Sequence, residues 1–146
     1  YVFNFYVKDS SNDNEKFQRI MIRKLIEKLK NEGLDKKKFI QTMKNLRYSN
    51  NTIDFYVEEN LKKNAMILEK DNRFILNQIF FQQPYEVAFR SLSELIRLMG
   101  KKHYPVRGRK LDKIMRNIEK NVLFKTTLGG CIIEKVNQSI IISKEQ

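Results

Sequence analysis

Four cationic side chains in the last third of the chain have the spacing that places them on one side of a helix. Arg109, Lys113 and Arg116 are four and three residues apart, and Lys110 precedes Lys113 by three residues. The apolar residues between them, from Leu111 onward, recur at positions that face a core. An exposed row of arginine and lysine holds phosphate groups through charge-assisted hydrogen bonds, without reading a base sequence. The pattern predicts a polyanion-binding helix over residues 108–121.

The surrounding sequence concentrates further positive charge around that helix. Residues 97–125 contain ten basic and two acidic side chains, so they supply two-thirds of the net charge of +12. A uniformly solvated basic surface would spread this excess, whereas a local patch raises the potential where a polyanion binds. His103 is either a phosphate or base contact within the patch or an ordinary surface histidine. The other predicted members of the patch are Arg97, Lys101, Lys102, His103 and Arg107.

The remaining reactive residues do not assemble into a catalytic site. Cys131 and His103 are the only residues of their types, which excludes an internal disulfide and a multi-cysteine metal centre. Cys131 is interpreted as a small buried residue, and Gly129–Gly130 as a tight turn in preference to a phosphate-binding nest. Phe80 and Phe81 could stack on bases, but core packing is favoured. We therefore expect no catalytic residue, no metal site and no cofactor held by this chain.

Periodicity and capping residues predict a mainly α protein of about four helices with two short β-hairpins, an α+β fold in which helices dominate. Gly33 ends the first helix and Asp35 caps the second, in which the polar stretch around Asn50–Asn51 predicts a bend or short break. Pro84 suits the first turn of the third helix and Gly100 its end. The predicted helices span residues 13–32, 36–64, 84–99 and 108–121.

β-Branched residues mark the two hairpins and the opening of the chain. A turn signal at residues 70–72 separates two apolar runs between residues 65 and 82, and Asn137–Gln138 separates two more in TTLGGCIIEKVNQSIIISKE. The opening YVFNFYV predicts a short strand or extended segment. No apolar run reaches the roughly 20 residues that cross a bilayer. We expect a soluble, cytoplasmic protein without a membrane partner.

Two stretches of the chain resemble segments of the tRNA(Ile)-lysidine synthetases. DSSNDNEKFQRIMIR contains Asp9, Ser11 and Asn12 followed by Arg19 and Arg23, and is similar to an Asp-x-Ser-Asn…Arg-x-x-x-Arg segment at the end of their nucleotide-binding catalytic domain. The second stretch, PYEVAFRSLSELIRLMGKKHYPVRGRKLDKIMRNI followed by TLGGCIIEKVNQSIIISKE, resembles the region that comes next in the family. The resemblance covers residues 7–145, and the order and spacing of the two stretches carry it.

The resemblance implies a part of an ATP-dependent ligase that adenylates the wobble cytidine of an isoleucine tRNA and attaches lysine. The family's Ser-Gly-Gly-x-Asp-Ser signature is absent from this sequence, so the chain looks like the C-terminal part of the enzyme, catalytically silent without an N-terminal catalytic domain. ATP, Mg and lysine are expected for the full-length enzyme, and tRNA is the expected partner. Arg19 and Arg23 match arginines that approach the catalytic cleft and its tRNA, whereas Ile20 stands where the family commonly has asparagine.

The same resemblance implies a division of the chain. Residues 1–24 would be the tail of the catalytic domain and a linker helix, residues 25–123 a helical substrate-binding domain with a small hairpin near 65–80, and residues 124–146 a β-hairpin packed on it. Two alternatives stay open: a stand-alone basic helical adaptor that binds RNA, DNA or an acidic protein, and an interaction domain that docks through YVFNFYV. The oligomeric state is not predicted.

Overall fold

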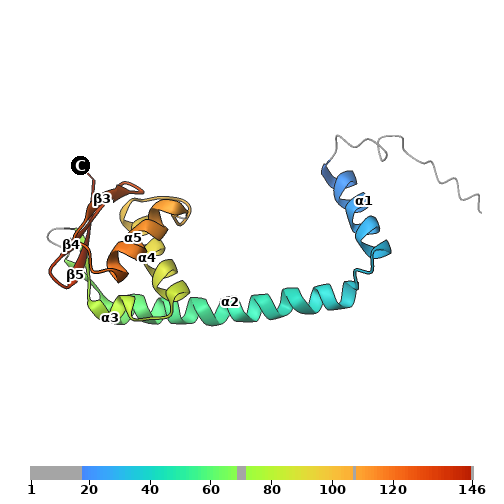
Figure 1. Ribbon diagram of the computed structural model, residues 1–146, viewed down its shortest axis with the longest axis horizontal. Helices are drawn as coiled ribbons and strands as arrows, with labels where there is room; N and C mark the ends of the chain where they lie inside the picture. Colours follow the sequence, from blue (N-terminus) through green and yellow to red (C-terminus); the bar gives the residue numbers. More distant parts are fainter. Residues whose placement is uncertain (1–17, 69–71, 107, 146) are drawn as a thin grey trace, which may run out of the picture. The chain divides into compact units, whose positions relative to one another are not determined.

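The computed structural model describes residues 18–68, 72–106 and 108–145. These residues form two compact units that meet between Arg47 and Tyr48, within a single long helix (Figure 1). Each unit is described by itself. The opening segment YVFNFYV, which predicted a strand, lies outside the described residues.

The first unit contains helix α1, Gln18–Asn31, and the beginning of helix α2, Lys36–Asn64. The chain leaves α1 through Gly33, whose φ of +93° is left-handed, and the Leu34 N–H donates to the Leu29 carbonyl over 2.8 Å. The Asp35 carboxylate then accepts from the backbone N–H of Lys37 over 2.8 Å. The predicted stop at Gly33 and cap at Asp35 are confirmed.

Helix α2 runs without interruption through Asn50–Asn51, so the predicted bend is wrong. The polar side chains of this stretch form hydrogen bonds with residues one turn away on the same helix. They therefore do not replace the hydrogen bonds between the backbone groups of the helix. Asn50 Nδ2 donates to Asp54 one turn later, and the Thr52 hydroxyl donates to the Tyr48 carbonyl. Asn50 also accepts from the Arg90 guanidinium over 2.6 Å, which ties this part of the helix to its neighbour.

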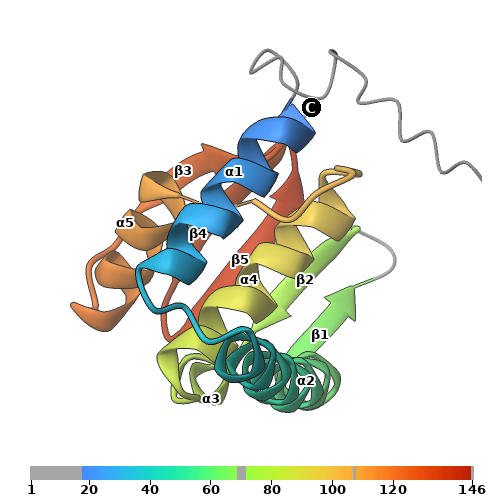
Figure 2. The same ribbon diagram turned by 90° about the vertical axis from the view of Figure 1, so that its right-hand side faces the viewer.

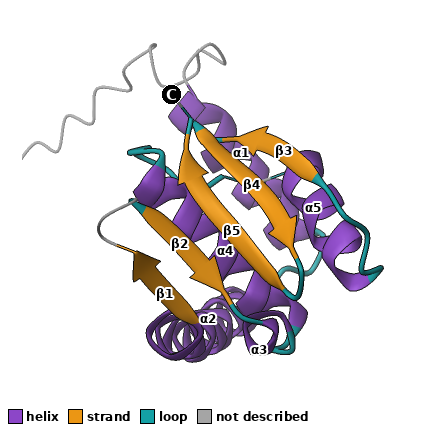
Figure 3. Ribbon diagram, turned by 90° about the vertical axis from the view of Figure 1, so that its left-hand side faces the viewer, coloured by secondary structure: helices purple, strands orange, loops and turns teal. Residues whose placement is uncertain are grey.

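The second unit is built on one antiparallel five-stranded sheet of order β1-β2-β5-β4-β3 (Figure 3). Hairpins from two distant parts of the sequence join where β2 pairs with β5, from Arg73 opposite Ser143 to Leu76 opposite Ile140. The strands are β1 Ala65–Leu68, β2 Arg73–Leu76, β3 Lys125–Leu128, β4 Cys131–Val136 and β5 Ser139–Lys144.

The predicted fold class, α+β with helices dominant, is confirmed, but two details of the hairpins differ. The strand expected to continue toward residue 82 ends at Leu76, because Asn77 caps the short helix α3, Gln78–Phe81, by accepting from the Phe80 N–H over 2.9 Å. The last segment forms three strands, because Gly129 and Gly130 both adopt positive φ and turn the chain between β3 and β4.

Helices α4, Tyr85–Met99, and α5, Arg109–Glu119, cover one face of the sheet (Figure 2). Their apolar stripes pack on the strand residues that point to that face, such as the paired Ile133 and Ile142, both fully buried. Pro84 is the N-cap of α4 and Gly100 its C-cap, within one residue of the predicted ends. The segment between α4 and α5, residues 100–108, is called the connector below. The two helices that flank it are therefore anchored on a common core.

A buried polar joint holds the end of α2 against this core. Asn60 is 3% exposed, and its Nδ2 donates to the Phe80 carbonyl over 3.2 Å and to the Ser91 hydroxyl over 3.1 Å. Its Oδ1 accepts from Asn64 over 2.9 Å. One side chain thus links α2, α3 and α4. The amide nitrogen and the amide oxygen of this buried residue both form hydrogen bonds, as buried polar groups generally do.

Replacing Asn60→Ala should lower the free energy of unfolding by about 1–3 kcal/mol, because the Phe80 carbonyl and the Ser91 hydroxyl lose a partner where water does not reach. Urea denaturation followed by circular dichroism measures the change. The matched control is Asn51→Ala, an exposed asparagine of the same helix, which should alter stability by less than about 0.5 kcal/mol. Equal effects of the two substitutions would contradict the joint.

Candidate nucleic-acid interface

Helix α5 has one apolar and one cationic side, as its spacing predicts. Leu111, Ile114 and Met115 are buried in the core. On the opposite side all four predicted cations are exposed, and we call this set the α5 basic face: Arg109, Lys110, Lys113 and Arg116. Because the buried side anchors the helix, the four charges project from a rigid support.

No carboxylate among the described residues forms an ion pair with the α5 basic face. The helix also begins without a side-chain cap, because its N-cap is Gly108 with a φ of +99°. Cations in the first turn of a helix are disfavoured by its macrodipole, and uncapped N–H groups attract anions. The start of α5 thus holds unneutralised positive charge together with backbone donors, an arrangement that suits a phosphate group.

The single acidic residue in the first turn of α5 is hydrogen-bonded to α4. Asp112 accepts a hydrogen bond from the Tyr85 hydroxyl on α4 over 3.2 Å. Burial raises the pKa of Tyr85, the hydrogen bond to Asp112 raises this pKa further, and the charge of Arg116 lowers it. Tyr85 therefore joins α4 to α5 and keeps the Asp112 carboxylate on the flank of the helix.

The connector between α4 and α5 adds exposed cations directly before the basic face. Lys101, Lys102 and His103 are all exposed. The connector is tied down at both ends: the Ser93 hydroxyl donates to the Val106 carbonyl, and a Cβ at Gly100 would lie 2.0 Å from the Gly129 carbonyl oxygen. Its cations thus extend from a segment that packs on the β3–β4 turn.

Arg97 is the member of the predicted patch whose charge is neutralised by an ion pair. Its Nε lies 2.8 Å from one Glu94 oxygen and its Nη2 lies 2.5 Å from the other. This bidentate bond lowers the pKa of Glu94 and raises that of Arg97. Arg97 belongs to a neutral pair, which sets it apart from the α5 basic face.

Three further predicted residues fall elsewhere. Arg19 and Arg23 are exposed on α1, which belongs to the first unit. Arg107 lies outside the described residues. The structure therefore groups the four α5 cations with Lys101, Lys102 and His103, whereas the binding of tRNA by any of these residues stays a prediction.

The interpretations of the glycine pair, the cysteine and Phe80 agree with the structure. Gly129–Gly130 is the β3–β4 turn, and Phe80 is fully buried in the core with Phe81 packed against it. Cys131 is fully buried, and its Sγ lies 3.5 Å from the Ile96 carbonyl oxygen. Burial raises the pKa of the Cys131 thiol to about 11. The thiol is protonated at neutral pH and packs as an apolar group.

Cys131 should therefore react with a disulfide reagent such as dithionitrobenzoate at pH 8 about two orders of magnitude more slowly in the folded protein than in denaturant. The folded pKa of about 11 leaves little thiolate at that pH, and burial blocks the reagent. The rate should rise as the pH approaches 11. Equal rates in buffer and in denaturant would show that the thiol is accessible.

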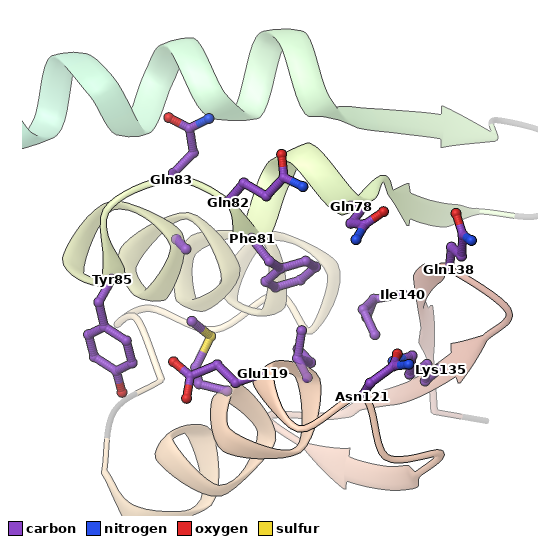
Figure 4. A pocket seen from close by; sticks show the side chains of 13 residues that line it. Gln78, Phe81, Gln82, Gln83, Tyr85, Glu119, Asn121, Lys135, Gln138 and Ile140 are labelled. Atoms are coloured by element: carbon purple, nitrogen blue, oxygen red, sulfur yellow. The ribbon is translucent and has the colours of Figure 1, made fainter.

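Sequence reasoning missed a pocket that Figure 4 shows at the end of the sheet. It has a volume of about 340 Å³ and lies among α3, α4, α5 and the β4–β5 turn. The residues that line the pocket come from segments far apart in the sequence, so no local motif indicates it. Five of its lining side chains are carboxamides: Gln78, Gln82, Gln83, Asn121 and Gln138.

A second concavity, of about 480 Å³, lies between α2 and α4 and has an acidic rim. Arg90 bridges it by pairing with Glu86 over 2.7 Å and with Asp54 over 3.3 Å. Asp54, Glu58, Glu86 and Glu94 all line this groove. Its negative charge makes it unsuited to phosphate, in contrast to the α5 basic face.

No helix among the described residues is both long and apolar enough to cross a membrane. No three His, Cys, Asp or Glu side chains gather there in an arrangement that could hold a metal ion.

Comparison with known proteins identifies two similar sequences. The tRNA(Ile)-lysidine synthases of Wolbachia sp. subsp. Brugia malayi (strain TRS) and of Wolbachia pipientis wMel are each 27% identical to this chain in alignments of 143 residues that cover 96% of the chain. The chain spans about a third of the length of these relatives. No family model matches the sequence, and no solved structure matches the fold. The resemblance recognised in the sequence is confirmed over almost the whole chain.

Proposed function

We propose that this chain is the part of a tRNA(Ile)-lysidine synthase that binds the tRNA and positions it for modification. The premise is its similarity to two such synthases along 96% of its length. The observation that supports a binding role is the α5 basic face, four exposed cations without an ionic partner among the described residues. A tRNA is a polyanion whose phosphates match such a surface.

The proposed role is positioning and not sequence readout. Lysine and arginine on the outside of a helix contact phosphate oxygens, and these contacts set the register and orientation of a nucleic acid. The four cations stand on a helix whose other side is locked in the core, so the orientation that they impose is transmitted through a rigid unit. We assign the chemical step to the complete enzyme. In this step a cytidine is adenylated and lysine is attached.

The proposal places the binding of ATP, Mg and lysine in a part of the enzyme other than this region. The ATP-pyrophosphatase signature Ser-Gly-Gly-x-Asp-Ser does not occur in the sequence. The described residues also lack a carboxylate or histidine cluster suited to a metal ion. The donor set of the described residues therefore does not fit these groups.

Reversing the charge of the α5 basic face, Arg109→Glu, Lys110→Glu, Lys113→Glu and Arg116→Glu together, should weaken tRNA binding by at least about tenfold near 0.1 M salt. The slope of log Kd against log salt should also become shallower, by about three if each cation holds one phosphate. Filter binding over a salt series measures both quantities. Circular dichroism should be unchanged, because all four side chains are exposed.

A control variant carries the same change of net charge at four exposed lysines in the first unit: Lys36→Glu, Lys37→Glu, Lys38→Glu and Lys44→Glu. Acidic residues near the start of α2 are compatible with its dipole, so this helix should remain folded. We expect the control to lose less affinity than the α5 variant. An equal loss would mean that net charge alone governs binding, and unchanged tRNA binding by a folded α5 variant would refute the proposed interface. Stronger binding to duplex DNA than to tRNA would favour the general adaptor.

A further inference from the structure

The pocket at the end of the sheet is lined by groups that can form neutral hydrogen bonds around an apolar floor. Ala88, Met115 and Ile140 contribute apolar atoms, and five carboxamides surround them. The side chains of Gln78, Gln82 and Gln138 form no hydrogen bond with another described residue. Each carboxamide offers both donors and an acceptor, so the rim of the pocket presents both kinds of group without a net charge.

Aromatic rings complete the pocket. The Phe81 ring is directed into the cavity from α3, and Tyr85 lies at the α4 end of the opening (Figure 4). The Tyr85 ring stacks on Phe89 with centroids 5.8 Å apart, and its hydroxyl is held by Asp112, so its orientation is restrained from two sides. A planar ligand that enters the pocket can therefore stack on a preorganised ring while its edge meets the carboxamides.

The pocket has one cationic and one anionic side chain, Lys135 and Glu119, among its lining residues. Lys135 donates to the Oδ1 of Asn121, which spans the α5 and β4 sides of the cavity. Glu119 is exposed on the α5 side. The pocket itself is thus suited to a neutral, planar group with donors and acceptors on its edge, more than to a phosphate or a free amine.

The pocket adjoins the α5 basic face. Met115, Ile118 and Glu119 of α5 line the cavity, and Arg116 of the basic face belongs to the same turn of the helix. Arg116 is close enough to Tyr85 to lower the pKa of its hydroxyl against the raising effect of burial. A phosphate held by Arg116 would therefore have its attached nucleoside within reach of the rim of the pocket.

From this juxtaposition we infer that the pocket receives one unpaired nucleobase of the bound RNA, stacked on Tyr85 or Phe81 and hydrogen-bonded along its edge by carboxamides such as Gln82 and Gln138. Single-stranded nucleotides are recognised in this way by aromatic platforms and by asparagine or glutamine. The inference rests on the proposed tRNA-binding function and adds to it a second kind of contact. The α5 basic face holds the backbone, and the pocket selects an unstacked base.

The test compares two short RNA probes that carry the same phosphates. One is a trinucleotide of adenosine, and the other is its fully abasic counterpart, which keeps the riboses and phosphates alone. Isothermal titration should show the adenosine trinucleotide binding at least about fivefold more tightly, as expected for a stacked base. Equal affinity of the two probes would refute the base pocket.

Substitutions at exposed positions then test whether the pocket causes the preference for the adenosine trinucleotide over the abasic probe. Gln82→Ala with Gln138→Ala removes two edge partners, and both side chains are exposed, so the fold should persist. This variant should bind the two probes with nearly equal affinity. The matched control, Gln41→Ala with Asn51→Ala on α2, removes two exposed carboxamides outside the pocket and should keep the preference. A preference that survives in the pocket variant would place the base elsewhere and refute the inference.

The two proposals fail in different ways. If the α5 charge reversal leaves tRNA affinity unchanged, the proposed interface is refuted whatever the trinucleotides do. If that reversal weakens both tRNA and abasic RNA while the adenosine probe shows no advantage in the unmodified chain, the interface stands and the base pocket is refuted.

Discussion

The pairing of β2 with β5 is the contact on which the second unit depends. It joins residues near 75 to residues near 141, from Arg73 opposite Ser143 to Leu76 opposite Ile140, and so combines two local hairpins into one sheet. Everything between them in the sequence must then return to the same sheet, and α4 and α5 do so by covering one of its faces. The buried stripe of α5 is fixed by this constraint, and its cationic side is left to the solvent.

The same pairing also produces the pocket. The end of β2 leads into α3, and the β4–β5 turn lies beside it because β5 pairs with β2. Gln78 and Gln138, sixty residues apart in the sequence, therefore line a common cavity. Forming such a non-local contact costs loop-closure entropy, and the burial of Leu76, Ile140 and Ile142 in the core offsets that cost.

What the sequence predicted well depends on local physics. Capping by Asp35, the stop at Gly33 and the side of α5 that carries Arg109 and Lys113 all follow from neighbours within one or two helical turns. The end of β2 at Asn77 also had a local signal, since asparagine is a common helix cap, but β-branched residues on both sides outweighed it.

What could not be predicted required knowledge of distant partners. Helix α2 continues through Asn50–Asn51, and Asn50 there has a partner forty residues away, Arg90, that its sequence neighbours do not indicate. The charge of Arg97 is a different case, because its partner Glu94 lies only three residues away on the same helix, a local pairing that the prediction of the basic patch did not include. The five carboxamides of the pocket are unremarkable in the sequence, since glutamine and asparagine on a surface usually face water.

The apolar stripes of the first unit show another limit of periodicity. Met21, Leu25 and Leu29 repeat along α1 as a core-facing stripe does, yet they are between 41% and 57% exposed. A repeat of this kind predicts a helix and the side that will be covered, but it does not identify what covers that side. In the second unit the sheet supplies the partner for the apolar stripes of α4 and α5.

Charge and shape have separate roles in the proposed binding surface. Electrostatic attraction to phosphates is long-ranged and salt-dependent, and it does not distinguish one RNA sequence or structure from another very well. The pocket acts at contact distance and accepts only a base that has left its stack. A surface that places Arg116 beside Tyr85 can couple the two, because backbone contacts reduce the entropy lost when a base enters the pocket. The acidic groove lined by Asp54, Glu86 and Glu94 repels phosphates in the same unit, so repulsion there and attraction at α5 together restrict how a polyanion can lie.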